Sequence, residues 1–140
     1  MRAVLDTNIL VSALIAPTGN PDAIYRAWLD GKFTLLTCAE EIDELRSTLH
    51  KPRVAALIKP HKAGRQVNDL KELAEHIEEL PKVERSSDPD DDYLLALAEA
   101  GRADYLVTGD RSGLLALVRH KGTSIVTARA FAALVRKDMR

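Results

Sequence analysis

The chain has 140 residues, of which 46% are hydrophobic and 29% are charged, a composition typical of a soluble globular protein. The formal net charge of −1 excludes a bulk electrostatic attraction to nucleic acid or to an anionic membrane, and the single cysteine, Cys38, excludes an intramolecular disulfide. We therefore expect one domain over residues 1–140, located in the cytoplasm and without a membrane-spanning segment.

Short apolar segments of strand length alternate along the chain with segments of helical pattern. This alternation predicts an α/β fold in which helices cover both faces of a mostly parallel sheet of about four to five strands. In the first part of the chain we expect a strand at 3–5, helices at 8–16 and 22–29, a strand at 33–37 and a helix at 39–49. A helix at 54–80, interrupted at Pro60 and Gly64, and a strand around Val83 should follow. In the last part we expect a helix at 88–100, a strand at 103–108, a helix at 113–119, a strand at 123–127 and a helix at 128–137.

Two of these strands end at a carboxylate. Asp6 directly follows the first strand, and Asp110 follows the strand that ends at Thr108. Ligands of α/β sheets bind beyond the carboxyl ends of the strands, where both aspartates are expected to lie. Each of them alone could be a turn or cap residue. Two such acids at two strand ends predict a site that holds cations.

A third acid belongs to the run of aspartates that opens the predicted helix at 88–100. The apolar stripe of this helix lies three, four and seven residues after Asp91, at Leu94, Leu95 and Ala98. Asp91 is therefore expected in the first turn at the top of the buried face, and Asp92 on a more exposed stripe. Asp88 or Asp90 is left as the N-cap. Acids in a first turn also occur for helix-dipole reasons alone.

The predicted helix at 39–49 carries four acids, Glu40, Glu41, Asp43 and Glu44. Its buried stripe consists of Ile42, Leu45 and Leu49. Periodicity does not select a functional acid among the four, although Glu41 lies closer to the edge of the stripe than Glu44 does. A solvated helix face explains all of them.

A cluster of Asp6, Asp91, Asp110 and one glutamate must take up a proton or a cation at neutral pH. Two carboxylates about 5 Å apart repel each other by roughly 3 kcal/mol at an effective dielectric constant near 20. A ligand set made only of oxygen suits Mg²⁺ or Mn²⁺. The four histidines show no metal-ligand spacing, and the sequence has neither a GxxxxGK[ST] phosphate loop nor a Gly-x-Ser-x-Gly elbow.

Four short sequence pieces occur in an order and spacing that extend over most of the chain. They are Val4-Leu5-Asp6-Thr7-Asn8, Glu44-Leu45 followed by Leu49 and Lys51-Pro52, Asp88-Pro89-Asp90-Asp91-Asp92, and Val107-Thr108-Gly109-Asp110. In these pieces the chain resembles the PIN-domain family, in particular small prokaryotic proteins similar to VapC-type toxins. The resemblance implies a three-layer α/β/α sandwich. It also implies a catalytic and metal-binding set around Mg²⁺ or Mn²⁺, formed by Asp6, Glu44, Asp91 and Asp110. The choice of Glu44 comes from the resemblance and not from the helix pattern.

The resemblance further implies what surrounds these acids. Asn8 and Thr108 are candidates for orienting the carboxylates by hydrogen bonds. Asp92 stands where similar proteins often have asparagine, and it either joins the metal shell or faces water. The implied activity is that of a metal-dependent endoribonuclease that hydrolyses RNA phosphodiester bonds, as the toxin of a type II toxin–antitoxin system.

The expected partners are RNA, a second copy of the chain and an antitoxin protein. The charged helical segment at 54–80 could serve dimerisation or antitoxin docking. Basic residues that could guide RNA fall into two groups: Lys51, Arg53, Lys59, Lys62 and Arg65 in one, and Arg111, Arg119 and Lys121 in the other. A solvated surface explains them equally well, unless they border the acidic site.

Two alternative functions are left open at this stage. One is a PIN-fold module with weak catalysis that binds RNA or protein. The other is a phosphoacceptor, similar to a response-regulator receiver or a haloacid-dehalogenase-like phosphatase, which also uses an aspartate after the first strand. A receiver would need an acidic pair just before Asp6, and such a phosphatase usually carries an acid at the position of Asn8. Neither feature is present.

Overall fold

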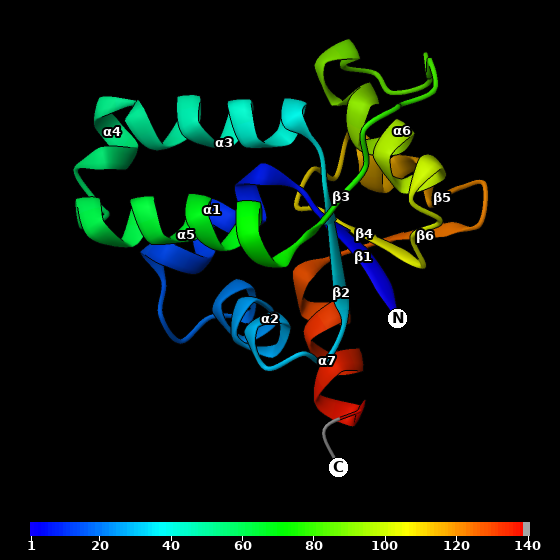
Figure 1. The fold of residues 1–140 in the computed structure, drawn as a ribbon. Coiled ribbons are helices and arrows are strands. Elements are labelled where there is room, and N and C mark those ends of the chain that lie inside the picture. The colour runs from blue at the N-terminus through cyan, green and yellow to red at the C-terminus, as the bar shows by residue number, and fades with distance from the viewer. Residues whose placement is uncertain (139–140) are drawn as a thin grey trace.

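We describe the computed structural model of the protein for residues 1–138 (Figure 1). Its centre is a six-stranded sheet with the strand order β3-β2-β1-β4-β6-β5. The strands are β1 (Arg2–Leu5), β2 (Thr34–Thr37), β3 (Glu75–His76), β4 (Tyr105–Val107), β5 (Arg119–His120) and β6 (Thr123–Val126). Neighbouring strands are parallel apart from β5 and β6, which are antiparallel. The predicted α/β fold with a mostly parallel sheet is confirmed.

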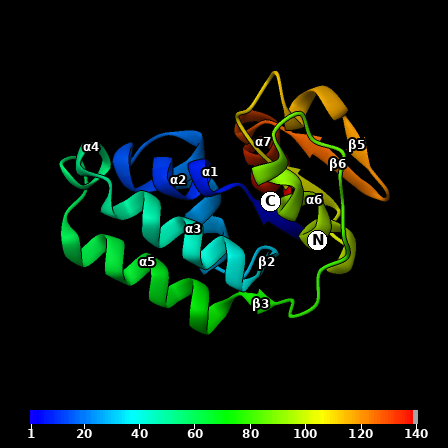
Figure 2. The ribbon, with the colours of Figure 1, turned by 90° about the horizontal axis from the view of Figure 1, so that it is seen from above.

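Seven α-helices and two short 3₁₀ helices lie within the described residues. The α-helices are α1 (Thr7–Ile15), α2 (Asn20–Leu29), α3 (Ala39–His50), α4 (Pro52–Ala55), α5 (Pro60–Leu73), α6 (Asp92–Ala100) and α7 (Ala128–Asp138). The 3₁₀ helices are η1 (Pro89–Asp91) and η2 (Leu114–Leu117). Figures 1 and 2 show α3 and α5 side by side, joined by α4 at the end that lies farthest from the sheet.

The helices form two layers because alternate residues of the central strands point to opposite faces of the sheet. One core combines residues of α1, α2, α3, α5 and α7 with one set of strand side chains: Ala3, Leu5, Leu35 and Val107. A second core combines α6 with the alternate set: Val4, Leu36, Leu106 and Ile125. The middle of the sheet is therefore apolar on both faces, at residues 3–5, 35–36 and 106–107, as expected for strands buried on both sides.

The predicted helix at 54–80 is wrong in its last part. α5 begins at Pro60, as expected for a proline in a first helical turn, but it continues through Gly64 and ends at Leu73. The chain then pairs with β2 as the two-residue edge strand β3, and the side chain of Glu75 forms an ion pair with Arg2 on β1. The strand expected around Val83 is absent from the described structure, where this residue is half-buried in a loop against the second core.

The predicted helix at 113–119 is also partly wrong. The segment starts as the 3₁₀ helix η2 and ends as β5, which turns back onto β6. The change of direction occurs at Val118, whose φ of 63° is unusual for a β-branched residue. The sheet therefore has six strands where about four to five were expected, and the added strands β3 and β5 have only two residues each.

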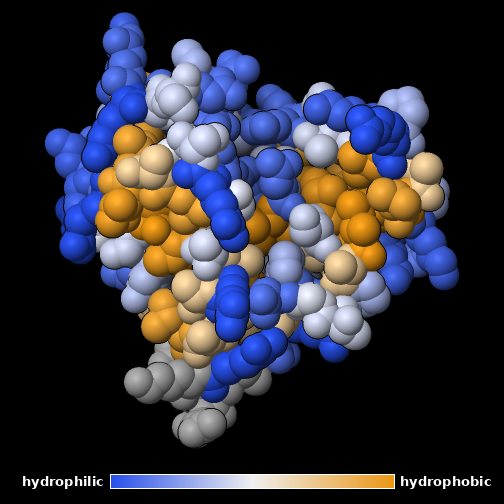
Figure 3. Space-filling model, turned by 180° about the vertical axis from the view of Figure 1, so that it is seen from behind, coloured by the Kyte–Doolittle hydropathy of each residue, from blue (hydrophilic) through white to orange (hydrophobic). Residues whose placement is uncertain are grey.

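Large apolar side chains remain exposed at Met1, Ile15, Leu29, Leu57, Leu73 and Val118. Figure 3 shows that hydrophobic residues gather in broad areas on the face seen from behind, crossed by hydrophilic side chains. Among the described helices, none combines the length and the apolar character needed to cross a membrane.

Candidate functional site

Asp6 lies at the carboxyl end of the central strand β1 and caps the N-terminus of α1. Its Oδ1 accepts a hydrogen bond from the backbone N–H of Asn8 (3.3 Å), and its Oδ2 accepts one from the hydroxyl of Thr108 (2.8 Å). Burial raises the pKa of this carboxyl, the two hydrogen bonds lower it, and the charges of Glu44 and Asp110 raise it further. The predicted orienting role of Asn8 thus falls to its backbone, because its side chain is exposed.

Thr108 connects the two strand-end aspartates. Its buried hydroxyl donates to Asp6, while its Oγ1 accepts a hydrogen bond from the backbone N–H of Asp110 (3.1 Å). The carboxylate of Asp110 accepts hydrogen bonds at Oδ1 from the N–H of Gly113 (3.0 Å) and the hydroxyl of Ser112 (3.5 Å). A Cβ atom at residue 113 would clash with Oδ2 of Asp110, so this position of the carboxylate requires Gly113.

Asp91 ends η1 and is half-buried at the start of α6, where periodicity placed it. Burial raises the pKa of Asp91 to about 6, and carboxylates from three other elements contribute to the rise: Asp6, Asp110 and Glu44, together with the adjacent Asp88. Asp88 caps η1, because its Oδ1 accepts a hydrogen bond from the N–H of Asp90 (3.0 Å). The acids predicted from separate parts of the chain therefore influence one another's ionisation.

Asp92 has a role that the sequence did not indicate. Its Oδ1 accepts hydrogen bonds from the backbone N–H groups of Arg85 (3.2 Å) and Ser86 (2.7 Å). The side chain therefore fixes the loop that leads into η1. Neither of the two expected roles, a metal ligand or a solvated residue, describes this contact.

Glu44 is exposed on α3, and its Oε2 accepts a hydrogen bond from the hydroxyl of Tyr93 on α6. The oxygen of Tyr93 also lies 3.4 Å from Oγ1 of Thr7. Burial raises the pKa of Tyr93, and the hydrogen bond to Glu44 adds to the rise, so that this phenol stays protonated. Tyr93 thereby joins α3 to α6 at the site.

Glu41 is a further acid that sequence reasoning did not select. It is 0% exposed, and its Oε1 accepts a hydrogen bond from the hydroxyl of Thr37 at the end of β2 (2.8 Å). Its Oε2 is buried and has no hydrogen-bond partner among the described residues. Burial raises the pKa of Glu41 to about 8, and the charges of Asp6 and Glu44 contribute. In the sequence, the burial of Glu41 was indicated only by its position near the edge of the apolar stripe of this helix.

Among the described side chains, no three or more His, Cys, Asp or Glu residues stand in an arrangement that would already hold a metal ion. Glu44 and Asp110 are engaged by protein donors, as described above. The donor chemistry nevertheless fits a divalent cation that prefers oxygen, since the acids raise one another's pKa and one buried carboxylate oxygen is unpartnered. The nearby thiol of Cys38 does not compete, because burial raises its pKa to about 12.

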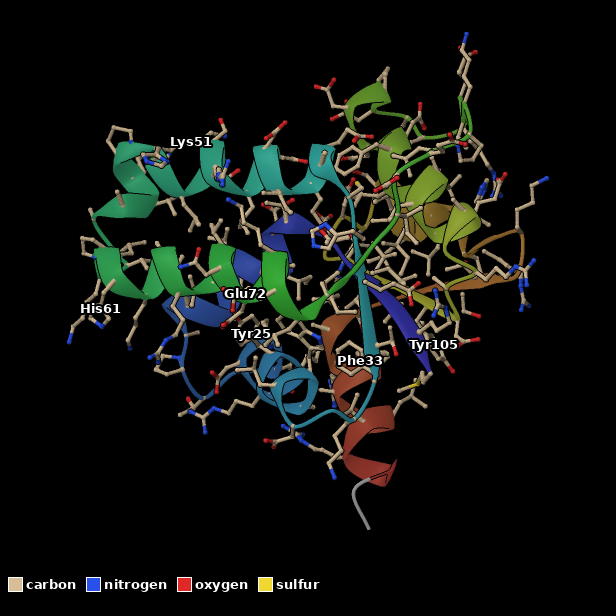
Figure 4. All side chains as sticks on the ribbon, in the orientation of Figure 1. Tyr25, Phe33, Lys51, His61, Glu72 and Tyr105 are labelled. Carbon is tan, nitrogen blue, oxygen red and sulfur yellow. The ribbon has the colours of Figure 1, made fainter. Side chains whose placement is uncertain are left out.

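Of the predicted basic residues, Arg111 lies beside the acids. It is exposed and directly follows Asp110. Lys51, by contrast, stands at the far end of α3 (Figure 4). The twelve residues of α3 span about 18 Å, which separates this basic group from the acidic end of the helix.

Comparisons with known proteins were made for both sequence and structure. A family model described as PIN domain matches residues 2–112, a segment that contains all of the acids discussed above. The crystal structure of PAE2754 from Pyrobaculum aerophilum is similar with a TM-score of 0.63, covering 98% of this chain and 90% of that chain at 20% sequence identity. At this identity the likeness shows the fold alone. The search of the curated proteins found no match.

Proposed function

The chain belongs to the PIN-domain family, and from this premise we propose that it is a metal-dependent endoribonuclease that hydrolyses RNA phosphodiester bonds. PIN domains are typically nucleases and usually use divalent metal ions. One observation carries the proposal: burial and the charges of Asp6, Asp88, Asp110 and Glu44 raise the pKa of Asp91 to about 6. Such a concentration of negative charge at a sheet edge favours a divalent cation.

We assign the binding of Mg²⁺ or Mn²⁺ and the catalytic role to Asp6, Glu44, Asp91 and Asp110. The bound ion would supply a water of lowered pKa and a positive charge opposite the phosphodiester. Thr108 holds the two strand-end aspartates together through its single hydroxyl, and Gly113 holds the carboxylate of Asp110 through its N–H. The guanidinium of Arg111 would contact an RNA phosphate beside them.

Tyr93 has a separate part in this proposal. Its phenol fixes Glu44 from the side of α6. Burial and the hydrogen bond to Glu44 raise the pKa of this phenol in the ion-free protein, so it stays the donor of that bond. With an ion present, Tyr93 would orient Glu44 through a carboxylate oxygen that the ion does not use.

The test is cleavage of structured and unstructured labelled RNAs in Mg²⁺, Mn²⁺ or EDTA. Asp91→Asn should abolish cleavage, and Asp90→Asn is the matched control, because Asp90 is the exposed residue just before it. Cutting that persists in EDTA, or that is equal in the Asp91→Asn variant and the parent, would count against the proposed site. The Asp110→Asn variant tests the opposite side of the cluster.

A more specific proposal is that the protein acts in the cytoplasm as the toxin of a type II toxin–antitoxin system and forms a homodimer. The resemblance to VapC-type toxins supports this role. An apolar hollow of about 510 Å³ between α3 and α5, lined by Leu49, Ile58, Ala63 and Val67 among others, offers a surface that an antitoxin protein could cover. Induced expression in a bacterial host should arrest growth, and the Asp6→Asn variant should not. Sedimentation of the purified chain tests dimerisation.

The second candidate is a PIN-fold module that binds RNA but cleaves it poorly. The observation that favours it is that the acids of the described structure are not yet arranged as a set of three around an ion. The same RNAs distinguish the two functions. Metal-dependent cleavage supports the nuclease, while binding without cleavage supports the module.

A further inference from the structure

Glu41 occupies the innermost position of the acidic cluster. It lies one turn before Glu44 on α3, at the spacing of neighbours on one helix face. Its partner Thr37 ends β2, the strand directly beside β1, and Asp6 is the first residue after β1. The two charged groups that act on Glu41 are the carboxylates of Asp6 and Glu44. Glu41 therefore faces the same space as the proposed ion-binding acids.

Glu41 differs from the neighbouring acids because its oxygen without a partner is buried. Oε2 of Glu44 is engaged by Tyr93, and Oδ1 of Asp110 is engaged by Gly113. Oε2 of Glu41 is fully buried and has no partner among the described side chains, although Thr37 holds the other oxygen of the same carboxyl. A buried carboxyl oxygen without a partner is costly and needs a physical reason.

We propose that Glu41 is an additional ligand of the divalent cation at this site, which gives its free Oε2 to the ion while the hydroxyl of Thr37 holds Oε1. The inference rests on the proposed function, because it deepens the ligand set of the same site. The hydrogen bond from Thr37 fixes the carboxyl plane, as outer partners of metal-binding carboxylates commonly do. A cation would also supply the positive charge that makes a buried carboxylate tolerable.

One other buried side-chain atom of the described structure lacks a partner, and it does not point to a ligand. Oε1 of Gln66 is unpartnered, but the Nε2 of the same amide donates to the carbonyl of Leu10 (2.7 Å). Gln66 belongs to α5 and is neutral, so its orphan oxygen adds no charge for a cation to balance. Among the described residues, a carboxyl with a buried free oxygen and acidic neighbours occurs at Glu41 alone.

The test measures Mn²⁺ binding to the metal-free protein by calorimetry, which does not depend on RNA cleavage. Glu41→Gln should raise the Kd for Mn²⁺ by about 10- to 100-fold, and Glu40→Gln, an exposed neighbour on the same helix, should leave it unchanged. If Asp6→Asn weakens binding and Glu41→Gln does not, the inference is wrong and the proposed function stands. If the parent binds no divalent ion, both are wrong.

Thermal denaturation separates an ion ligand from a structural residue. In EDTA, Glu41→Gln should unfold at a temperature no lower than the parent, and Mn²⁺ should raise its Tm by less than it raises that of the parent. A lower Tm in EDTA with the full rise on adding Mn²⁺ would show that Glu41 is only structural. Thr37→Val removes the hydroxyl and leaves Glu41 in place, so it should also weaken Mn²⁺ binding. Unchanged binding in that variant would contradict the assigned role of Thr37.

Discussion

The buried carboxyl of Glu41 should make the stability of the metal-free protein fall as the pH rises. Burial raises the pKa of Glu41 in the folded protein to about 8, from an ordinary value of 4.5. Between these two values the folded state binds the proton that the unfolded chain has already released. Folding therefore becomes less favourable as the pH increases through this window, which is opposite to the behaviour of a carboxylate in a salt bridge.

The size of the effect follows from the gap between the two pKa values. Between pH 5 and pH 9 this gap corresponds to a loss of roughly 4 kcal/mol in the free energy of unfolding. Glu41→Gln keeps the shape of the side chain and can still accept a hydrogen bond from Thr37, but it removes the ionisation. The variant should therefore be close to the parent in stability at pH 5 and more stable than the parent by several kcal/mol at pH 9.

Urea denaturation in EDTA at pH 5, 7 and 9 measures this difference directly. The comparison of parent and Glu41→Gln removes the contributions of Asp6 and Asp91, whose pKa values are also raised by burial and which both proteins share. Glu40→Gln on the exposed face of α3 is the matched control and should follow the parent. A constant difference between parent and Glu41→Gln at all three pH values would refute the reasoning.

Three further predictions concern the strand-end acids and their rim. Gly113→Ala should lower RNA cleavage by about 100-fold, measured as kcat, because a Cβ atom would displace the carboxylate of Asp110. Thr108→Val should lower the free energy of unfolding by about 1–3 kcal/mol in urea titrations, because it removes a buried hydrogen bond to Asp6 and a half-buried one from the N–H of Asp110. Arg111→Ala should weaken RNA binding. It should also reduce the slope of log Kd against log salt concentration by about one, the value for one lost phosphate contact, whereas Lys51→Ala should change neither.

Much of the fold was predictable because the central strands are short and carry consecutive apolar residues that are bounded by polar ones. β1, β2, β4 and β6 read in this way, and they form the middle of the sheet. The strands β3 and β5 were missed because two residues have no periodicity of their own. β3 exists through its pairing with β2 and the contact of Glu75 with Arg2, which are interactions between distant parts of the chain.

In the candidate site, too, some features follow from local sequence pattern and others from packing between distant parts of the chain. Asp6 and Asp110 could be chosen from the sequence, because each follows an apolar strand and strand ends gather at one edge of a parallel sheet. Asp91 could be chosen because its helix has a clear apolar stripe. These three positions needed only local pattern. The sequence could not establish how strongly these acids affect one another's pKa. This effect depends on how three separate elements pack together.

The sequence could not show which acid of α3 is buried. The pattern of a helix does not reveal which residues of other elements pack against it. Glu41 and Glu44 are one turn apart, yet one is 0% exposed and the other is exposed. The two carboxyls have different partners: Thr37 at the end of β2 donates a hydrogen bond to Glu41, and Tyr93 on α6 donates one to Glu44. Both partners lie outside α3, and neither stands at a position that helical periodicity within α3 could indicate.

These contacts divide the site into a fixed side and an adjustable side. On the fixed side, buried threonine hydroxyls hold Glu41 and Asp6 against the ends of β2 and β1. On the adjustable side, Glu44 is exposed and is held by one phenol. Because Glu44 is exposed and held by one hydrogen bond, whereas Asp6 and Glu41 are buried, ion binding is expected to move Glu44 and to leave the buried pair in place. Crystals of the protein grown with and without Mn²⁺ would decide this, and a displaced Asp6 with an unmoved Glu44 would reverse the assignment.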